Sequence, residues 1–365
     1  MRTTLIALSL SLLAPALTLG QSLRVGAGGS YEVFRFRTPA VVNVESIELV
    51  TVPLTARARL SNAVAVEALS AWAVGRLVRS DGSESRLAGP TDTELRVLLG
   101  LGRGLVTITG IAQLPTGSSA LSLEEVDVAG LIAADVLPFR ISHWGAGGGF
   151  GLNAAVTRRL GEYAAGLSAG YVVARKFEPL DQDAFEYRPG NQLHIRAAVD
   201  RTIGTTGKAA LVVSWLHSAE DEVDGNNLFR AAPRYEAVGS YAFALNSGAG
   251  IVYLGYLRRA GGEYLQVQRI LPVEELLFAG TGVEVRVGAG KLRPRVDLRV
   301  LRREDGVGQG YTASLGADFE WPIGTLVVIP TARARVGNVL LREAAESAFT
   351  GFDIGLGLRF GAINP

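Results

Sequence analysis

The chain of 365 residues has no cysteine, one methionine and three histidines, and aromatic residues make up only 7% of it. The lack of cysteine excludes disulfides, zinc–thiolate sites and cysteine nucleophiles. Beyond the N-terminus, the chain has no run of the 18 or more apolar residues that predict a membrane helix. The net charge of +1, with no separate basic stripe, argues against a nucleic-acid partner. A protein that crosses a membrane without such a helix has to do so with strands.

Glycine, by contrast, is abundant, with 45 residues spread through segments of strand-like sequence. Each glycine inside a helix costs about 1 kcal/mol, so the composition disfavours a helical protein. Residues 1–20 combine Arg2 with an apolar run broken at Pro15, and small residues follow near position 20. This pattern predicts a secretory signal peptide, which leaves residues 21–365 as the mature chain.

Alternation at period two is the main structural signal. In the segment 293–300, Pro294, Val296, Leu298 and Val300 alternate with charged residues, and 283–287 and 352–360 repeat the split. Successive strand side chains point to opposite faces, so each strand has one apolar and one polar face. A closed sheet of such strands, with the apolar face outward, is the signature of an outer-membrane β-barrel. A secreted β-sandwich is the alternative, because its outer faces also accept polar residues.

Connection lengths favour the barrel. Short glycine-rich turns alternate with long segments, as in barrels with short periplasmic turns and long external loops. The long segments are 79–92, 114–142, 176–190, 217–232, 259–276, 302–309 and 336–349. We therefore predict an all-β, transmembrane antiparallel barrel of 14 to 16 strands, the number depending on whether the first hairpin (30–37 with 47–60) forms.

The third long loop, residues 117–142, contains the one convincing helix. Ser122 and Glu125 have the spacing of a capping box, and the residues after them are apolar on most of the circumference. Either this helix packs against the barrel mouth or it captures an apolar ligand. The candidate ligand-binding residues are Leu121, Val128, Leu131, Ile132 and Val136. A second apolar stretch, 264–277, is predicted on the same rim.

These features resemble the long-chain fatty-acid transporter family of outer-membrane proteins. The resemblance rests on the layout, on Leu114-Pro-Thr-Gly117 before an apolar loop helix, and on Tyr187-Arg-Pro-Gly190. It implies a fourteen-strand barrel with an N-terminal hatch, and capture of a hydrophobic substrate by external loops. The chain departs from the family at Thr38-Pro-Ala40, where the family has Asn-Pro-Ala. It also has a short segment before the first strand and five residues after Phe360.

Enzymatic and metal sites are not predicted. The histidines, His143, His194 and His217, have no serine or aspartate partner at a telling spacing. The glycines of 145–151 lack the strand–helix context of a dinucleotide loop, and the acidic stretch 220–226 lacks the ligand pattern of a calcium loop. We expect no enzyme activity, no cofactor and no resident metal.

The polar face is predicted to line the lumen, with arginine in excess. Either a water-filled lumen favours anions or the charges pair and close it. The predicted lumen residues are Arg57, Arg59, Arg196, Asp200, Glu284, Arg286, Arg293, Arg295, Asp297, Arg299, Asp318, Glu320, Arg333, Arg335, Asp353 and Arg359.

The sequence thus predicts an outer-membrane channel or transporter for passive uptake of a small hydrophobic or amphiphilic compound. The alternative is a polar-solute porin or a structural barrel without transport. Expected partners are outer-membrane lipid, the barrel-assembly machinery of a Gram-negative cell and the transported compound.

Overall fold

The computed structural model describes residues 23–182, 185–342 and 345–361. The predicted signal peptide, 1–20, lies outside these ranges. No helix among the described residues is long and apolar enough to cross a membrane.

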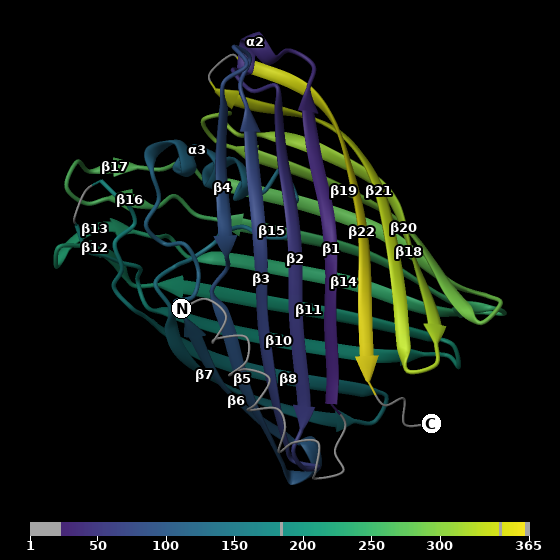
Figure 1. The fold of residues 1–365 in the computed structure, drawn as a ribbon. Helices are drawn as coiled ribbons and strands as arrows, with labels where there is room; N and C mark the ends of the chain where they lie inside the picture. Colours follow the sequence, from purple (N-terminus) through teal and green to yellow (C-terminus); the bar gives the residue numbers. More distant parts are fainter. Residues whose placement is uncertain (1–22, 183–184, 343–344, 362–365) are drawn as a thin grey trace.

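Antiparallel strands form one closed barrel with sixteen strand positions (Figure 1). Closure follows from the register, because β1 pairs with β2 on one edge and with the last strand, β22, on the other. The strands are β1 (Leu23–Phe36), β2 (Ser46–Arg59), β3 (Val64–Val78), β4 (Glu84–Pro90), β5 (Thr93–Leu101), β6 (Val106–Leu114), β7 (Gly149–Leu160), β8 (Tyr163–Ala174), β10 (Gln192–Ile203), β11 (Gly207–Ser218), β14 (Arg234–Leu245), β15 (Gly248–Arg259), β18 (Glu274–Val287), β19 (Gly290–Arg303), β20 (Gly310–Ile323), β21 (Leu326–Arg342) and β22 (Ala345–Gly361).

The count of sixteen agrees with the upper end of the prediction, and the first hairpin forms. β4 and β5 occupy a single position, since both pair with β3, one with each half. Short turns, together with Leu23 and Gly361, lie at one end of the barrel, called here the turn end. The longer connections lie at the other end, the loop end.

Helix α2 (Pro39–Val42) lies at the loop end, between β1 and β2, whereas η1 (Gly102–Gly104) is a turn at the turn end, between β5 and β6. Three long loops together form a separate five-stranded sheet, called here the outer sheet. Its strands are β9 (Tyr187–Arg188), β12 (Glu220–Val223), β13 (Asn226–Arg230), β16 (Glu263–Tyr264) and β17 (Arg269–Ile270).

Two predicted loops are wrong. The segment 79–92 contains β4, whose Ser85 and Leu87 are buried, because pairing with β3 turns a Ser-, Gly- and Pro-bearing stretch into wall. The segment 336–349 belongs to the hairpin of β21 and β22, which extends beyond the neighbouring strands.

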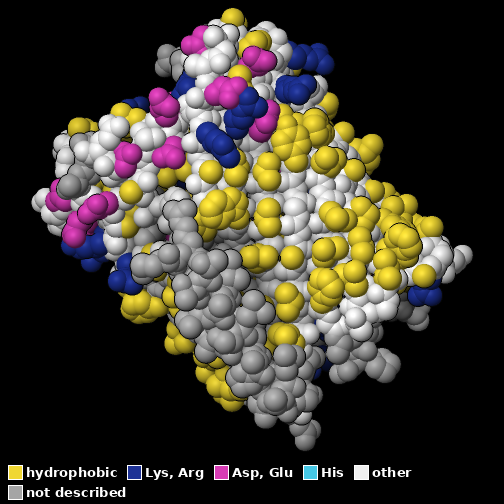
Figure 2. Space-filling view, viewed as in Figure 1, with side chains coloured by type: hydrophobic (Ala, Val, Ile, Leu, Met, Phe, Trp, Pro, Cys, Tyr) yellow, Lys and Arg dark blue, Asp and Glu magenta, His cyan; other side chains and the backbone are white. Residues whose placement is uncertain are grey.

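The two faces of the wall differ as the alternation predicts. Leu315, Leu254 and Ile354 are all more than half exposed on the outer face, and Figure 2 shows such apolar side chains covering the outside of the visible wall. The inner face carries the predicted lumen charges, such as Arg57 of β2, Asp297 of β19 and Arg359 of β22. The molecule therefore has its apolar surface on the outside.

Candidate functional site

The loop between β6 and β7, residues 115–148, enters the barrel and holds helix α3 (Leu123–Ile132). Figure 1 shows α3 behind β4, within the barrel outline. The Ser122 hydroxyl accepts a hydrogen bond from the Glu125 amide, and the Glu125 carboxylate accepts one from the Ser122 amide, so the predicted capping box is present. The helix ends at Ile132, so it includes Val128, Leu131 and Ile132 of the predicted capture residues but not Leu121 or Val136.

One face of α3 packs against the inner wall. Val128 and Ile132 are buried over Gly75 of β3, where an added Cβ would lie 2.8 Å from both side chains. Trp144 is buried beside them and its indole N–H donates to the Ala73 carbonyl at 3.2 Å. Glycine at position 75 therefore creates the space that seats the helix.

Both ends of the loop are bound to Asp92, in the break between β4 and β5. Its carboxylate accepts hydrogen bonds from the amides of Gly117 (3.0 Å) and Ala146 (2.8 Å), and its own amide donates to the Trp144 carbonyl. The strand break, which sequence reasoning did not identify, is thus where the loop leaves the wall and returns to it.

A buried ionic cluster fixes the far end of the loop. Arg335, Glu32 and Asp353 are almost fully buried, and Arg335 lies 3.0 Å from the Glu32 carboxylate and 3.4 Å from that of Asp353. Arg140 of the loop donates its amide to Glu32 and its guanidinium to Asp353, each at 3.0 Å. Glu32 and Arg140 were missed by sequence reasoning. The only signal for Glu32 was an acid on the inner face between Tyr31 and Val33.

The loop also reaches the wall formed by β15 and β20. The buried Thr312 hydroxyl donates to the Val136 carbonyl at 2.6 Å, and Asp135 lies 3.4 Å from Arg259. Leu257, Leu276 and Leu301 join the same apolar cluster. The loop therefore fills the loop-end lumen along the walls of β1–β4 and of β15–β22.

The predicted capture residues differ in how far they are buried. Val128, Ile132 and Val136 are buried in this packing, whereas Leu121 and Leu131 are partly buried. The accessible apolar side chains of α3 are instead Leu123 and Val126, which are 65% and 41% exposed. The capture role of these residues stays a prediction.

The strand registers place the predicted lumen residues together on the inner face of the wall. Those with an ionic partner within 4 Å are Arg57, Asp200, Glu284, Arg293, Asp318, Glu320, Arg335, Asp353 and Arg359. Asp297 instead accepts hydrogen bonds from the hydroxyls of Tyr253 and Ser314. No such ionic partner is found among the described residues for Arg59, Arg196, Arg286, Arg295, Arg299 and Arg333.

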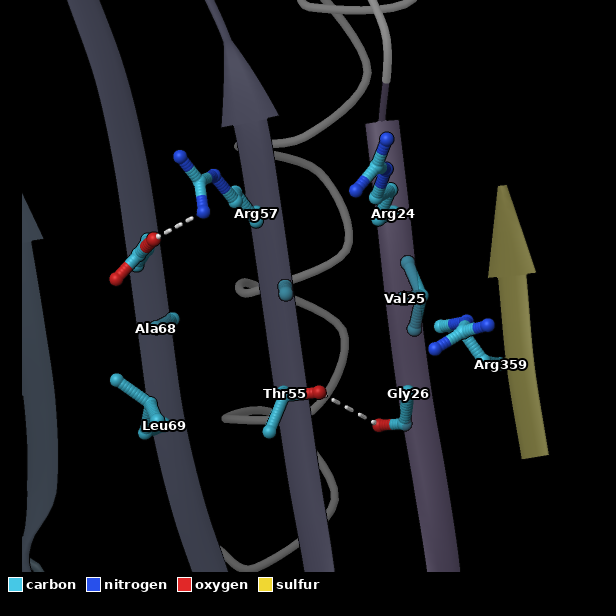
Figure 3. A pocket seen from close by; sticks show the side chains of 10 residues that line it. Arg24, Val25, Gly26, Thr55, Arg57, Ala68, Leu69 and Arg359 are labelled. Carbon is cyan, nitrogen blue, oxygen red and sulfur yellow. Dashed lines mark hydrogen bonds and ion pairs between the residues drawn. The ribbon is translucent and has the colours of Figure 1, made fainter. Parts of the chain in front are cut away.

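Water reaches the inner face at the turn end. A pocket of about 340 Å³ there is lined by Arg24, Arg57 and Arg359, with Glu67 as its one carboxylate (Figure 3). The Arg57 and Arg359 side chains are about half exposed, in contrast to the buried cluster around Arg335. The inner face thus changes from accessible at the turn end to filled beneath the loop.

The wall opposite α3 is not covered in this way. Arg196 of β10 is exposed on the inner face, and Arg234 and Glu236 of β14 have side chains 39% and 32% exposed. Space for water therefore lies between the loop and the wall of β10–β14.

The histidines do not form a site. His194 and His217 lie on opposite faces of the wall, by the register of β10 and β11, and His143 lies in the loop beside Ser142. His217 stacks on Trp215 with ring centroids 5.7 Å apart. Among the described residues, no group of three or more His, Asp or Glu side chains is arranged to hold a metal ion.

No family model matches the chain, and no curated protein matches it. The solved structures similar in fold include two mutants of the porin from Rhodopseudomonas blastica, each 13% identical with a TM-score of 0.39. Another is described by the asymmetric conductivity of engineered proteins, with 13% identity and a TM-score of 0.38. Each alignment covers 93% of this chain and the whole of the other. Likeness at this level assigns neither family nor function.

Proposed function

We propose that the chain is an outer-membrane channel through which small hydrophilic solutes diffuse, narrowed at one end by the loop 115–148. The observation that carries the proposal is the inverted sidedness of a closed barrel, with apolar side chains outside and solvent-accessible charges inside. An apolar exterior of this kind matches lipid, and charged inner walls match water.

The path follows from the placement of the loop. Solutes enter beside α3, along the wall of β10–β14 where Arg196, Arg234 and Glu236 are accessible, and leave past the arginine-lined pocket at the turn end. Of the functions that the sequence suggested, this is the polar-solute alternative. The buried packing of Val128 and Ile132 supports it, because those side chains hold the loop in place instead of facing the lumen.

Conductance tests the channel. The purified full-length protein, inserted in a planar lipid bilayer, is expected to give discrete ion-conducting steps. A variant lacking residues 118–145 of the loop, joined by a short glycine linker, is expected to give larger steps because the narrowing is gone. A correctly folded, inserted barrel that gives no steps, with or without the loop, would contradict the proposal.

A second candidate is passage of an amphiphile, favoured by the exposed Leu123 and Val126 on α3. Under this alternative, Leu123→Asp together with Val126→Asp would abolish detergent or fatty-acid binding while the barrel remains folded. Ile132→Asp is a poor test, because Ile132 is buried and its replacement would disturb the packing of the loop. Binding unchanged in the double variant would remove this candidate.

A further inference from the structure

The inner wall beside the loop carries three arginines that the ionic clusters do not use: Arg295 and Arg299 of β19, and Arg333 of β21. Arg295 and Arg333 lie at the same height on either side of Gly316, to which both are paired in the register. An added Cβ on Gly316 would lie 2.9 Å from the Arg333 Cβ, so the absence of a side chain there gives Arg333 its room.

The positive charges of Arg295 and Arg333 are not neutralised by a neighbouring carboxylate among the described residues. No carboxylate of the described residues lies within 4 Å of Arg295, Arg299 or Arg333, and the Nε atoms of Arg295 and Arg333 are buried without a hydrogen-bond partner. A buried guanidinium N–H without a partner is costly, because it has lost water and gained nothing in exchange. The Arg295, Arg299 and Arg333 side chains are otherwise half-buried, so their remaining N–H groups are open to a ligand.

The carboxylates nearby are already engaged. Asp353 binds Arg140 and Arg335, Glu32 binds Arg335, and Asp297 accepts from two hydroxyls. Five guanidinium groups (Arg140, Arg295, Arg299, Arg333 and Arg335) face three carboxylates (Glu32, Asp297 and Asp353), which leaves a net charge of +2 in this part of the lumen.

We infer that Arg295 and Arg333, with Arg299 beside them, form a binding site for a small oxyanion, a carboxylate or a phosphate. Guanidinium groups offer paired N–H donors that match the oxygens of such groups. This inference rests on the proposed function and names its substrate class. The site lies on the inner wall level with the loop, because Arg299 is paired with Thr312, which binds Val136, and Arg333 is paired with Asp353, which binds Arg140. An anion that passes beside the loop therefore meets these arginines first and those of the turn-end pocket afterwards.

The test uses full-length protein in a planar bilayer with chloride as the carrier ion and inorganic phosphate as the probe; succinate serves as the carboxylate arm. Phosphate is expected to reduce the chloride current in a saturable manner. In the variant Arg295→Gln with Arg333→Gln, the half-blocking concentration is expected to rise about tenfold, as the loss of charge-assisted hydrogen bonds implies. Arg302→Gln is the matched control, because Arg302 is exposed on the outer face of β19.

Equilibrium binding of phosphate to the folded barrel in detergent is measured alongside. A conducting channel that neither binds phosphate nor is blocked by phosphate or succinate overturns the site and leaves the channel standing. A silent barrel that binds phosphate, and loses that binding in the double variant but not in the control, supports the site and removes the channel. Equal block in the wild type and the double variant also overturns the site.

Discussion

At the scale of single residues, Arg335 shows how a polar lumen can be made rigid. Its guanidinium is buried between Glu32 and Asp353 and lies 5.2 Å from the centre of the Phe34 ring. A buried ion pair adds little net stability relative to an apolar substitute, but removal of one partner leaves a charge without compensation. The cluster therefore fixes the position of the loop more than it stabilises the barrel as a whole.

Glu32→Ala is expected to lower the free energy of unfolding by about 3–5 kcal/mol, because it leaves Arg335 short of a partner and the Arg140 amide without its acceptor. Urea unfolding followed by tryptophan fluorescence measures the change. The control is Glu67→Ala, whose partner Arg57 is half exposed, with an expected loss below about 1 kcal/mol. Equal losses in the two variants would contradict this account.

At the scale of elements, α3 depends on the glycine beneath it. Gly75→Val places methyl groups where Val128, Ile132 and Trp144 now pack, and overpacking of this kind costs about 1–3 kcal/mol. The loop is expected to leave the wall, with a larger conductance and trypsin cleavage after Arg140, the one arginine or lysine of 115–148. Gly110→Val is the control, since an added Cβ there meets nothing within 4 Å. A loop that resists trypsin in both variants would show that Gly75 does not seat it.

The outer sheet has its own pH dependence. The Tyr187 hydroxyl donates to the Asp221 carboxylate at 2.6 Å, and burial together with this carboxylate raises the pKa of Tyr187 above its usual value of 10.0. The folded sheet favours the neutral phenol of Tyr187. The hydrogen bond to Asp221 therefore stabilises the folded sheet fully below pH 10, and this stabilisation is lost as the pH rises beyond that value. Protection from hydrogen exchange in 219–233, measured relative to the intrinsic base-catalysed rate, is expected to fall above pH 10 in the wild type and to stay independent of pH in Tyr187→Phe. If Tyr187→Phe shows the same pH dependence as the wild type, the dependence arises from another group.

The sequence predicts an element well when the cause of its structure is local in the chain, and poorly when that cause is a contact with a distant segment. The strands around Val296 and Ile354 follow from alternation, a local property, and their faces agree with the register. The sequence predicts a loop where β4 lies, because the strand character of β4 comes from pairing with β3, which is not local. The helix around Val128 was predicted, but not which of its faces packs, because its sequence is apolar nearly all round and only the wall selects the buried face.

At the scale of the whole molecule, the sidedness of the barrel makes the cost of a charge depend on the face that receives it. Leu315 of β20 is 62% exposed on the outer face, whereas its neighbour Ser314 points inward to Asp297. Inner positions accept charge because water and ionic partners are close, whereas outer positions would place it in hydrocarbon.

Leu315→Arg is accordingly expected to cost about 2–4 kcal/mol of folding free energy in lipid vesicles. Ala198→Arg, between Arg196 and Asp200 on the exposed inner face of β10, is the control and is expected to cost less. The two variants are compared by urea unfolding from vesicles. A larger cost for Ala198→Arg would mean that the outer face does not contact lipid.

The double attachment at Asp92 has a consequence for how such a protein diversifies. Because Gly117 and Ala146 both bind one carboxylate, the two ends of the 115–148 segment lie side by side. The entropy lost on closing a loop between them rises only slowly with loop length, so replacements of very different lengths have nearly the same cost. The insert can therefore be exchanged as a cassette, while the sixteen-strand scaffold keeps its pairing and its apolar outer surface unaltered.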